Sequence, residues 1–237
     1  MENILLVEDD LENCEILGEY LTLSGRYAAT IVHDAERALA LVQKQAFDLI
    51  LLDIILPGQS GIDLCARLRQ RIYCPIIFLS CLADDETIVR AMKLGGDDYL
   101  TKPFRYPVLE ARIEAVLRRT RQGGGARAGA ELIPLRPDLT LSVREHTLKR
   151  GAEEFFLSPT EFEILMYFID NPGRVLTFEE IYRHVWKRES LGDLRTVFSH
   201  THNLRKKLEE DPSNPRLIRT VPRTGYRFLP FGEGENA

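Results

Sequence analysis

The sequence predicts a doubly wound α/β domain built on a parallel sheet, followed by a smaller α+β domain. In the first half, short continuous apolar runs alternate with amphipathic helical stretches, which is typical of a parallel sheet that helices cover on both faces. A glycine-rich stretch at 121–130 then interrupts the chain, as expected of a flexible linker. The second half combines short, turn-broken strands with three helical stretches. We therefore expect domains at 1–120 and 131–232, with a disordered tail at 233–237.

The composition is that of an ordinary globular chain. The protein has 237 residues, of which 44% are hydrophobic and 28% charged, and this length suits two domains of modest size. No run approaches the roughly 18 apolar residues that a membrane-spanning helix needs, and the first residues lack the basic start of a secretory signal. We expect a cytoplasmic protein with no membrane partner.

The cysteines and the charges narrow the function further. The four cysteines, Cys14, Cys65, Cys74 and Cys81, form no CxxC pair, so free thiols are expected. Residues 1–120 carry a net charge of −6, whereas residues 195–227 hold eight basic and three acidic residues. This asymmetry indicates a front half that binds a cation and a back half that meets a polyanion.

Apolar runs of strand length lie at 4–7, 49–52, 76–79 and 99–100, and helical periodicity lies at 11–23, 35–45 and 107–119. In a doubly wound sheet the functional site lies beyond the carboxyl ends of the strands. The polar residues at those ends are Glu8, Asp9, Asp53, Ser80 and Lys102.

These strand-end residues suit phosphoryl transfer. Carboxylates brought together repel one another, and Mg²⁺ offsets this repulsion because it prefers oxygen ligands. Lys102 adds a positive charge, and the Ser80 hydroxyl can bond an incoming oxyanion. Asp53 is the candidate nucleophile. Hydrolases of the haloacid dehalogenase type are the competing interpretation, but they need a second aspartate two positions later, where this chain has Ile55. A turnover enzyme is therefore not expected.

Three motifs of the first 120 residues resemble the receiver domain of two-component response regulators: residues 6–10 (LVEDD), 52–58 (LDIILPG) and 96–104 (GDDYLTKPF). The resemblance implies a five-stranded parallel, flavodoxin/CheY-like fold in which Asp53 is phosphorylated. It also implies that Ser80 and Lys102 bind the phosphoryl oxygens, that Ser80 and Tyr99 form a switch, and that the Lys102–Pro103 bond is cis. The implied Mg²⁺ ligands are Asp9, Asp53 and the carbonyl group of Ile55, with Glu8 acting through water.

Departures from the family pattern surround Asp53. Cys81 stands where a very small residue is usual, and neither Ile55 nor Ala83 has a polar side chain to orient water. We therefore expect a phosphoacceptor that catalyses its own phosphorylation and loses the phosphoryl group slowly.

Capping boxes at Ser158 and Thr177 mark two helix starts in the second half. A third helix, at 194–210, carries one apolar stripe and an opposite face of basic, imidazole and amide side chains. Such a face fits a DNA major groove, although a solvated basic face is the alternative. The hairpin at 219–228 has a basic tip that suits a minor groove.

The second half resembles the winged-helix effector domain of the OmpR/PhoB class at residues 157–162, 171–176, 204–208 and 225–227. This resemblance implies binding to promoter repeats in double-stranded DNA. The predicted DNA-binding residues are Arg195, Thr196, Ser199, His200, His202, Asn203, Arg205, Lys206, Arg219, Arg223, Thr224 and Arg227. The loop at 187–193 is implied to face RNA polymerase. Pro222 and Arg223 stand where a basic residue and a glycine are usual, so the arginine of the wing is displaced by one position.

Members of this class dimerise when a sensor histidine kinase phosphorylates them. The residues implied at the homodimer interface are Ile88, Lys93, Asp97, Asp98, Val108, Arg112, Glu114 and Arg119. Lys93 and Glu114 reverse the usual signs, which preserves an attraction between them. The sequence thus predicts a transcriptional regulator controlled by phosphorylation of Asp53. A constitutively dimeric receiver and a signalling adaptor that binds only protein remain as alternatives.

Overall fold

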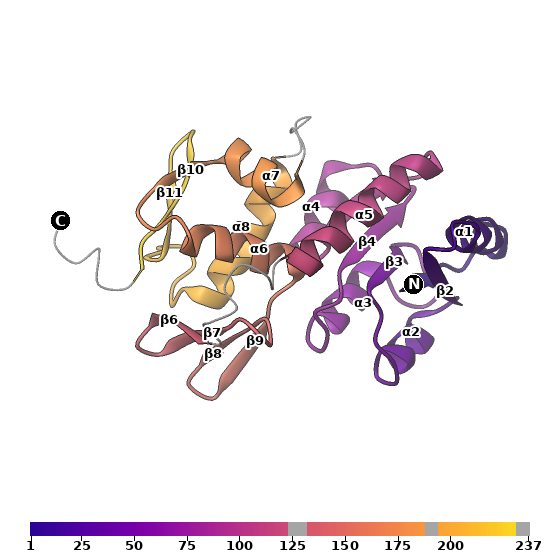
Figure 1. The fold of residues 1–237 in the computed structure, drawn as a ribbon, viewed down its shortest axis with the longest axis horizontal. Coiled ribbons are helices and arrows are strands. Elements are labelled where there is room, and N and C mark those ends of the chain that lie inside the picture. Colours follow the sequence, from indigo (N-terminus) through magenta and orange to yellow (C-terminus); the bar gives the residue numbers. More distant parts are fainter. Residues whose placement is uncertain (123–131, 188–193, 231–237) are drawn as a thin grey trace. The chain divides into compact units, whose positions relative to one another are not determined.

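The computed structural model describes residues 1–122, 132–187 and 194–230. The chain divides into two compact units, Met1–Arg118 and Arg119–Ala237 (Figure 1). Most of the predicted linker, the predicted tail at 233–237 and residues 188–193 of the predicted polymerase-facing loop lie outside the described residues. Among the described residues, no helix is both long and apolar enough to cross a membrane.

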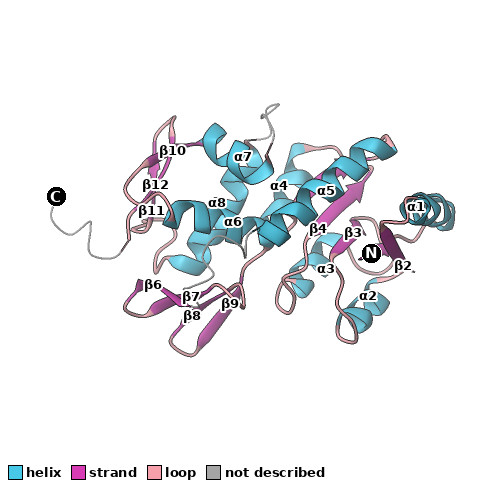
Figure 2. Cartoon of the chain, viewed as in Figure 1, coloured by secondary structure: helices cyan, strands magenta, loops and turns pink. Residues whose placement is uncertain are grey.

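The first unit is a five-stranded parallel sheet with helices on both faces, as predicted (Figure 2). Its strands are β1 (Glu2–Val7), β2 (Tyr27–Val32), β3 (Leu49–Asp53), β4 (Ile76–Ser80) and β5 (Asp98–Thr101), in the order β2-β1-β3-β4-β5. Its helices are α1 (Leu11–Leu23), α2 (Ala35–Val42), α3 (Gly61–Leu68), α4 (Asp85–Lys93) and α5 (Tyr106–Gln122).

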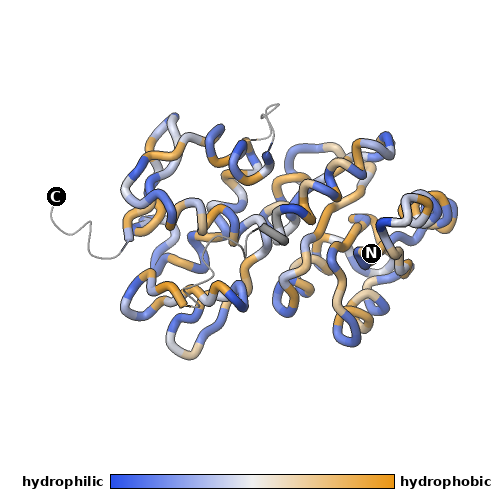
Figure 3. The backbone as a smooth tube through the Cα atoms, in the orientation of Figure 1, coloured by the Kyte–Doolittle hydropathy of each residue, from blue (hydrophilic) through white to orange (hydrophobic). Residues whose placement is uncertain are grey.

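Two cores lie on the two faces of this sheet, because successive strand side chains point to opposite sides. Ile4 and Leu6 of β1 pack with α1 and α5, whereas Leu5 and Val7 pack with α2, α3 and α4. Figure 3 shows the resulting hydrophobic strands. The strand order reverses direction beside β1, so the carboxyl ends of β1 and β3 mark the switch point where such sheets place their sites.

Helix α5 extends further than predicted. It continues to Gln122, so the first two residues of the predicted linker are helical. Arginine and glutamine favour helix, and the run of glycines begins only at residue 123.

The second unit begins with a four-stranded antiparallel sheet of β6 (Leu132–Arg136), β7 (Leu139–Ser142), β8 (Thr147–Arg150) and β9 (Glu153–Phe156). Helices α6 (Pro159–Ile169), α7 (Phe178–Trp186) and α8 (Arg195–Leu208) follow. A second sheet joins β10 (Val175–Thr177), β12 (Gly225–Phe228) and β11 (Ile218–Val221), in that order. Both predicted capping boxes are present, at Ser158 and Thr177.

Candidate functional site

The polar residues at the strand ends of the first unit meet at Lys102. Its Nζ lies 2.5 Å from Glu8 Oε2 and 2.5 Å from Asp53 Oδ2. These residues follow β1, end β3 and follow β5, and parallel pairing brings those ends to one edge of the sheet. Glu8 and Asp53 are 1% and 5% exposed, so the ammonium group lies between two buried carboxylates. The peptide bond between Lys102 and Pro103 is cis, as the resemblance implied.

Burial determines the protonation of this cluster. Loss of water raises the pKa of Glu8, and the hydrogen bond from Lys102 opposes that shift. Burial by itself lowers the pKa of Lys102, but hydrogen bonds to Asp53 and Glu8 outweigh this effect and leave that pKa raised. Lys102 therefore stays protonated and holds the two carboxylates together.

The backbone around Asp53 fixes its carboxylate. The amide of Ile55 donates to Asp53 Oδ1 at 2.8 Å, and the amide of Gly61 donates to the Ile54 carbonyl at 2.8 Å. A Cβ atom on Gly61 would lie 1.9 Å from the Asp53 carbonyl oxygen. Only a glycine at the start of α3 therefore lets this helix pack so closely on the end of β3, and sequence reasoning missed this residue.

Asp9 does not join this pair. It is exposed, while its neighbour Asp10 caps α1 by accepting hydrogen bonds from the amides of Glu12 and Asn13. In the described parts of the chain, no three His, Cys, Asp or Glu side chains form a group able to hold a metal ion. The structure thus brings together two of the three predicted carboxylates, Glu8 and Asp53, because Lys102 draws both toward its ammonium group.

Two further residues that sequence reasoning missed lie behind Glu8. Cys14 Sγ donates to the Glu8 carbonyl oxygen at 3.3 Å, and His33 Nδ1 lies 3.0 Å from the same oxygen. Burial raises the pKa of Cys14 to about 11, so its thiol remains a donor. Both side chains hold the backbone of Glu8. The available signal was the position of Cys14 on the buried face of the first helix.

Ser80 and Tyr99 share a partner in the loop after β4. Ser80 is fully buried, and its Oγ accepts from the amide of Leu82 at 3.2 Å. Tyr99 is 9% exposed, and its hydroxyl donates to the Leu82 carbonyl at 2.6 Å. The two predicted switch residues are therefore linked through Leu82, and the Tyr99 ring already lies inward.

Asp97 was predicted to lie at the dimer interface, but the structure places it in the interior of the first unit. Its side chain is fully buried, and Asp97 Oδ2 lies 2.5 Å from Arg69 Nη2 and accepts from the Ile76 amide at 2.9 Å. A buried carboxylate is stable only when donors surround it. Here the donors are Arg69, which follows α3, and Ile76, which begins β4, and both are far from residue 97 in the sequence. Asp97 therefore joins secondary-structure elements within one protomer.

Glu114, another residue predicted at the dimer interface, forms an ion pair within the protomer. Glu114 Oε1 lies 2.5 Å from Arg26 Nη1, and Arg26 immediately precedes β2, at the opposite edge of the sheet from β5. Glu114 therefore lies on the side of α5 toward β2, and its attraction to Lys93 across a dimer interface stays a prediction. Its carboxylate is already engaged by a cation of the same protomer.

The other predicted dimer residues are distributed as follows. Asp98 Oδ1 pairs with Arg112 at 2.6 Å, and Lys93 is exposed. Ile88 and Val108 are half-buried against the two cores. The side chain of Arg119 lies outside the described residues.

Helix α8 presents only part of the predicted DNA face. Arg195, His202 and Lys206 are exposed and Thr196 is half-buried. Three predicted contact residues are instead buried: Ser199, His200 and Asn203 are 3%, 0% and 6% exposed. His200 is corrected to a packing residue, since its ring lies 5.9 Å from the Trp186 ring, whereas for Ser199 and Asn203 the structure gives the burial alone. Helical periodicity alone does not reveal such contacts.

Arg205 holds the hairpin against α8. It donates to the Ile218 carbonyl at 2.8 Å and to Thr220 Oγ1 at 2.7 Å, and its guanidinium lies over the Tyr226 ring at 5.1 Å. The contacts of this predicted DNA-binding residue are thus mainly structural, because they join α8 to the hairpin. Glu209, which sequence reasoning missed, accepts hydrogen bonds from the amides of residues 216, 217 and 218 and fixes the start of β11.

The hairpin carries a concentrated positive charge. Arg219 and Arg227 are directly opposite in the β11–β12 register, and both are exposed. Arg223 and Thr224, in the connecting turn, are exposed as well. Like charges opposite each other destabilise a strand pair, and an anion lying over them relieves that repulsion. All four predicted hairpin residues therefore lie where a polyanion can reach them.

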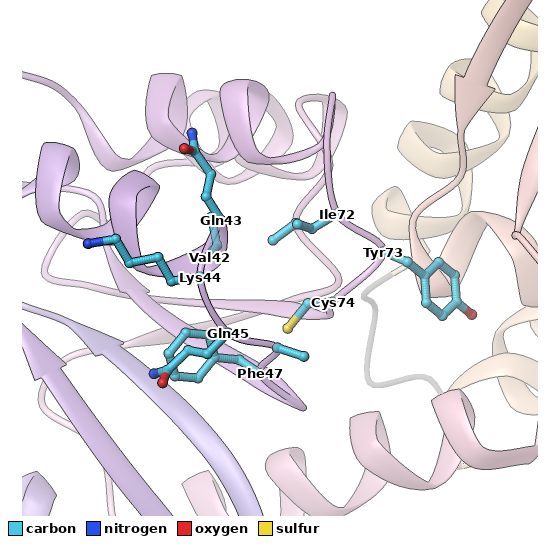
Figure 4. A pocket seen from close by; sticks show the side chains of 9 residues that line it. Val42, Gln43, Lys44, Gln45, Phe47, Ile72, Tyr73 and Cys74 are labelled. Atoms are coloured by element: carbon cyan, nitrogen blue, oxygen red, sulfur yellow. The ribbon is translucent and has the colours of Figure 1, made fainter.

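A further pocket lies at the other end of the first sheet (Figure 4). Its volume is about 440 Å³, and Val42, Phe47, Ile72 and Cys74 are among its lining residues. These residues precede β3 and β4, so the pocket is at the amino ends of the strands. It is therefore separate from the Lys102 cluster.

Comparisons with known proteins agree with this division. Residues 4–114 match the family described as response regulator receiver domain, and residues 152–228 match that described as transcriptional regulatory protein, C terminal. The sensory transduction protein RegX3 of Mycolicibacterium smegmatis is 37% identical over 96% of this chain and 99% of its own. The transcriptional regulatory protein AfsQ1 of Streptomyces coelicolor is 38% identical over 97% and 99%. A solved structure of a RitR mutant has a TM-score of 0.82 at 25% identity, covering 97% of this chain and 100% of that one.

Proposed function

Because the chain belongs to the two-component response regulators of the OmpR/PhoB class, which join a receiver to a DNA-binding domain, we propose that Mg²⁺-dependent phosphorylation of Asp53 promotes receiver dimerisation and promoter binding. The observation that carries this proposal is the buried Asp53 carboxylate, 2.5 Å from the ammonium group of Lys102. The family implies DNA and a sensor histidine kinase as partners. A regulator of chromosomal DNA would act in the cytoplasm.

In the proposed transfer, a carboxylate oxygen of Asp53 attacks the phosphorus of a kinase phosphohistidine or a small phosphodonor. The new oxygen–phosphorus bond forms as the donor's bond to phosphorus breaks, and the donor leaves with that electron pair. Lys102 and Ser80 lie at the same edge of the sheet, where ammonium and hydroxyl groups neutralise and orient the phosphoryl oxygens.

The chemistry of the oxygen donors at this edge suits magnesium, while among the described residues the carboxylates are not yet grouped as three. Asp9, Asp53 and the Ile55 carbonyl would hold the ion directly, and Glu8 through water; all are the oxygen donors that Mg²⁺ prefers. The raised pKa of buried Glu8 indicates that this edge accepts additional positive charge. Bound Mg²⁺ would supply that charge and offset the negative charge of the transferred group.

We further propose that the phosphorylated form persists, so that the protein acts as a phosphoacceptor and not as a turnover enzyme. The Ile55 side chain is 53% exposed two positions after Asp53, and it cannot orient a water molecule for attack. Cys81 is exposed and lines a pocket of about 330 Å³ with Lys102. An apolar side chain thus lies two positions after Asp53, and a thiol lines the pocket beside Lys102.

The proposed signal runs from Asp53 to the β5 edge. A phosphoryl group that attracts Ser80 would disturb the hydrogen bonds of Leu82 with Ser80 and with Tyr99. Tyr99 adjoins Asp98, whose carboxylate pairs with Arg112 of α5. The edge formed by α4, β5 and α5 is therefore the proposed homodimer face. Two paired effector units would then bind promoter repeats and contact RNA polymerase.

The proposal is tested on the full-length protein with acetyl phosphate and MgCl₂. Phosphorylation is followed by intact mass, oligomeric state by analytical ultracentrifugation, and affinity on a duplex that the protein selects from random DNA. Wild-type protein should gain the phosphoryl group, dimerise and bind more tightly, whereas Asp53→Asn should do none of these. Equal dimerisation of both proteins without phosphodonor would instead indicate a constitutive dimer.

A further inference from the structure

The carbonyl oxygen of Glu8 is held by two side chains that come from different elements. Cys14 of α1 donates its thiol hydrogen to this oxygen at 3.3 Å, and His33 Nδ1, just after β2, lies 3.0 Å from the same oxygen. Cys14 Sγ and His33 Nδ1 are 3.6 Å apart. A carbonyl oxygen only accepts and has two lone pairs, so His33 Nδ1 carries its proton in this contact and the two donors together occupy both lone pairs.

Further hydrogen bonds fix the backbone on both sides of Asp9. The Glu8 amide donates to the Val32 carbonyl at 3.1 Å. After Asp9, the side chain of Asp10 caps α1, and the Asp10 carbonyl accepts from the Cys14 amide at 3.0 Å. The peptide unit from Glu8 to Asp9 is planar, so the contacts that orient the Glu8 carbonyl also orient the backbone from which the Asp9 side chain leaves.

Two donors on one carbonyl exceed what packing requires. One hydrogen bond satisfies a buried carbonyl group, and the thiol of Cys14, which is 3% exposed, already supplies it. The half-buried imidazole of His33 adds a second donor, which fixes the direction of the carbonyl group as well. The side chain of the same residue, Glu8, pairs with Lys102 at 2.5 Å. The extra constraint therefore acts on the residue that joins β1 to the acidic edge of the sheet.

We propose that His33, assisted by Cys14, is a positioning residue for the proposed Mg²⁺ site: it orients the backbone shared by Glu8 and Asp9 and thereby sets the affinity for the ion. This inference rests on the proposed function, of which Mg²⁺ binding is a part. Outer groups that orient the ligands of a metal ion are worth about 10- to 100-fold in affinity. Loss of the His33 donor should therefore weaken binding of the ion and leave the transfer step itself unchanged.

The test measures Mg²⁺ affinity directly on the unphosphorylated full-length protein, through the amide NMR resonance of Ile55, which donates to Asp53 Oδ1 at 2.8 Å. His33→Phe keeps a ring but has no donor, and it should raise the Kd for Mg²⁺ about ten-fold. His33→Asn should recover most of the affinity, because its amide nitrogen can take the place of Nδ1. With acetyl phosphate, His33→Phe should need about ten-fold more MgCl₂ for its half-maximal phosphorylation rate, while its rate at saturating MgCl₂ should match that of wild type.

Cysteine variants separate positioning from packing. Cys14→Ala removes one of the two donors and should weaken Mg²⁺ binding less than His33→Phe does, because a thiol is a weak donor; Cys14→Ser should restore the affinity. Cys65→Ala is the matched control, because Cys65 is also buried and donates to a carbonyl, that of Leu94, at 3.5 Å. This control should lower the free energy of unfolding without changing the Kd for Mg²⁺.

The outcomes distinguish the inference from the function on which it rests. If the wild-type protein neither binds Mg²⁺ nor accepts a phosphoryl group at Asp53, the proposed function fails. If it does both and His33→Phe binds Mg²⁺ equally well, the assignment of His33 is wrong while the function stands. A loss of affinity in Cys65→Ala as large as that in His33→Phe would also overturn the assignment. Should His33→Phe not fold, the comparison of Cys14→Ala with Cys14→Ser decides the question in the same way.

Discussion

Asp97 Oδ2 lies 2.5 Å from Arg69 Nη2 in the interior of the first unit, and the side chains of Asp97 and Arg69 are 0% and 9% exposed. Asp97→Asn removes one charge of this pair and leaves the guanidinium with carbonyl partners, such as that of Gly95, but without a carboxylate. We expect the free energy of unfolding of the first unit to fall by about 3 kcal/mol, as measured by calorimetry on the full chain. The adjacent change Asp98→Asn is the control, because Asp98 lies nearer the surface with Arg112 and should cost less than half as much. Equal losses of stability in the two variants would contradict the interior position of Asp97.

Lys102→Met should separate stability from chemistry at the Asp53 site. Methionine keeps the length of the side chain but leaves Glu8 and Asp53 without their shared ammonium group. Two uncompensated buried carboxylates should destabilise the first unit by about 3 kcal/mol, and phosphorylation by acetyl phosphate should become slower. Adding Glu8→Gln should restore part of the stability, because Asp53 stays without a cation, but not the phosphorylation rate. Recovery of both would show that Lys102 has no role in transfer.

Gly61→Ala should disturb the proposed phosphoryl-accepting site through the backbone of Asp53. The added Cβ would lie 1.9 Å from the Asp53 carbonyl oxygen, which is backbone and unable to rotate away. We expect a loss of about 2–3 kcal/mol and slower phosphorylation. Gly18→Ala is the matched control, because its Cβ would meet only the terminal Cδ1 atom of Ile31 at 2.9 Å. A neutral Gly61→Ala variant would contradict the close packing of α3 on β3.

The second unit should lose stability as the pH falls below neutrality. Burial, with a smaller effect of Lys187, lowers the pKa of His184 to about 4 from 6.5. Between these values the unfolded chain binds a proton that the folded chain does not, so stability falls as the pH falls from about 6.5 toward 4. Because His184 is only half-buried, we expect about 1 kcal/mol between pH 7 and pH 5.

The His184 effect is measured by urea unfolding monitored through Trp186, the single tryptophan of the chain. His184→Phe preserves the stack on Tyr167, whose centroid lies 3.8 Å away, and should flatten the dependence. Some dependence should remain, because burial also lowers the pKa of His146. An unchanged pH profile in His184→Phe would exclude His184 as its source.

Arg219→Gln should act oppositely on stability and on DNA binding. In the free protein it removes the repulsion between Arg219 and Arg227, which are paired on the adjacent strands β11 and β12. The free energy of unfolding should therefore rise by about 0.5 kcal/mol. On DNA it removes one phosphate contact, so the slope of log affinity against log salt should decrease in magnitude by about one. An unchanged salt slope would show that Arg219 does not contact phosphate.

The strand-end site was predictable because it depends on a repeating pattern. Each apolar run of the first half ends in a polar residue, and parallel strands of a doubly wound sheet deliver those ends to one edge. Glu8, Asp53 and Lys102 therefore meet as expected. Asp9 has the same sequence signal as Glu8, but it lies in the bend between β1 and α1 and is exposed.

Residues whose environment comes from distant segments were not predictable in this way. Asp97 and Asp98 are neighbours of the same type, and only the position of Arg69 decides that Asp97 is the interior one. On α8, Ser199 and Asn203 are polar residues beside the apolar stripe, and yet both are buried. Phe198 has an apolar aromatic side chain of the kind usual in a core, but it lies exposed at the surface of the second unit.

The Glu209 carboxylate, just after α8, accepts hydrogen bonds from the amides of residues 216, 217 and 218. These bonds fix the position of the β11–β12 hairpin relative to α8. These two elements, which are proposed to contact DNA, consequently keep a constant separation. An operator whose grooves lie closer together or farther apart than α8 and the hairpin has to bend or twist to fit both. The free energy of that deformation varies with base sequence. Base pairs between the two contact regions, which no side chain touches, should therefore influence which promoters are bound.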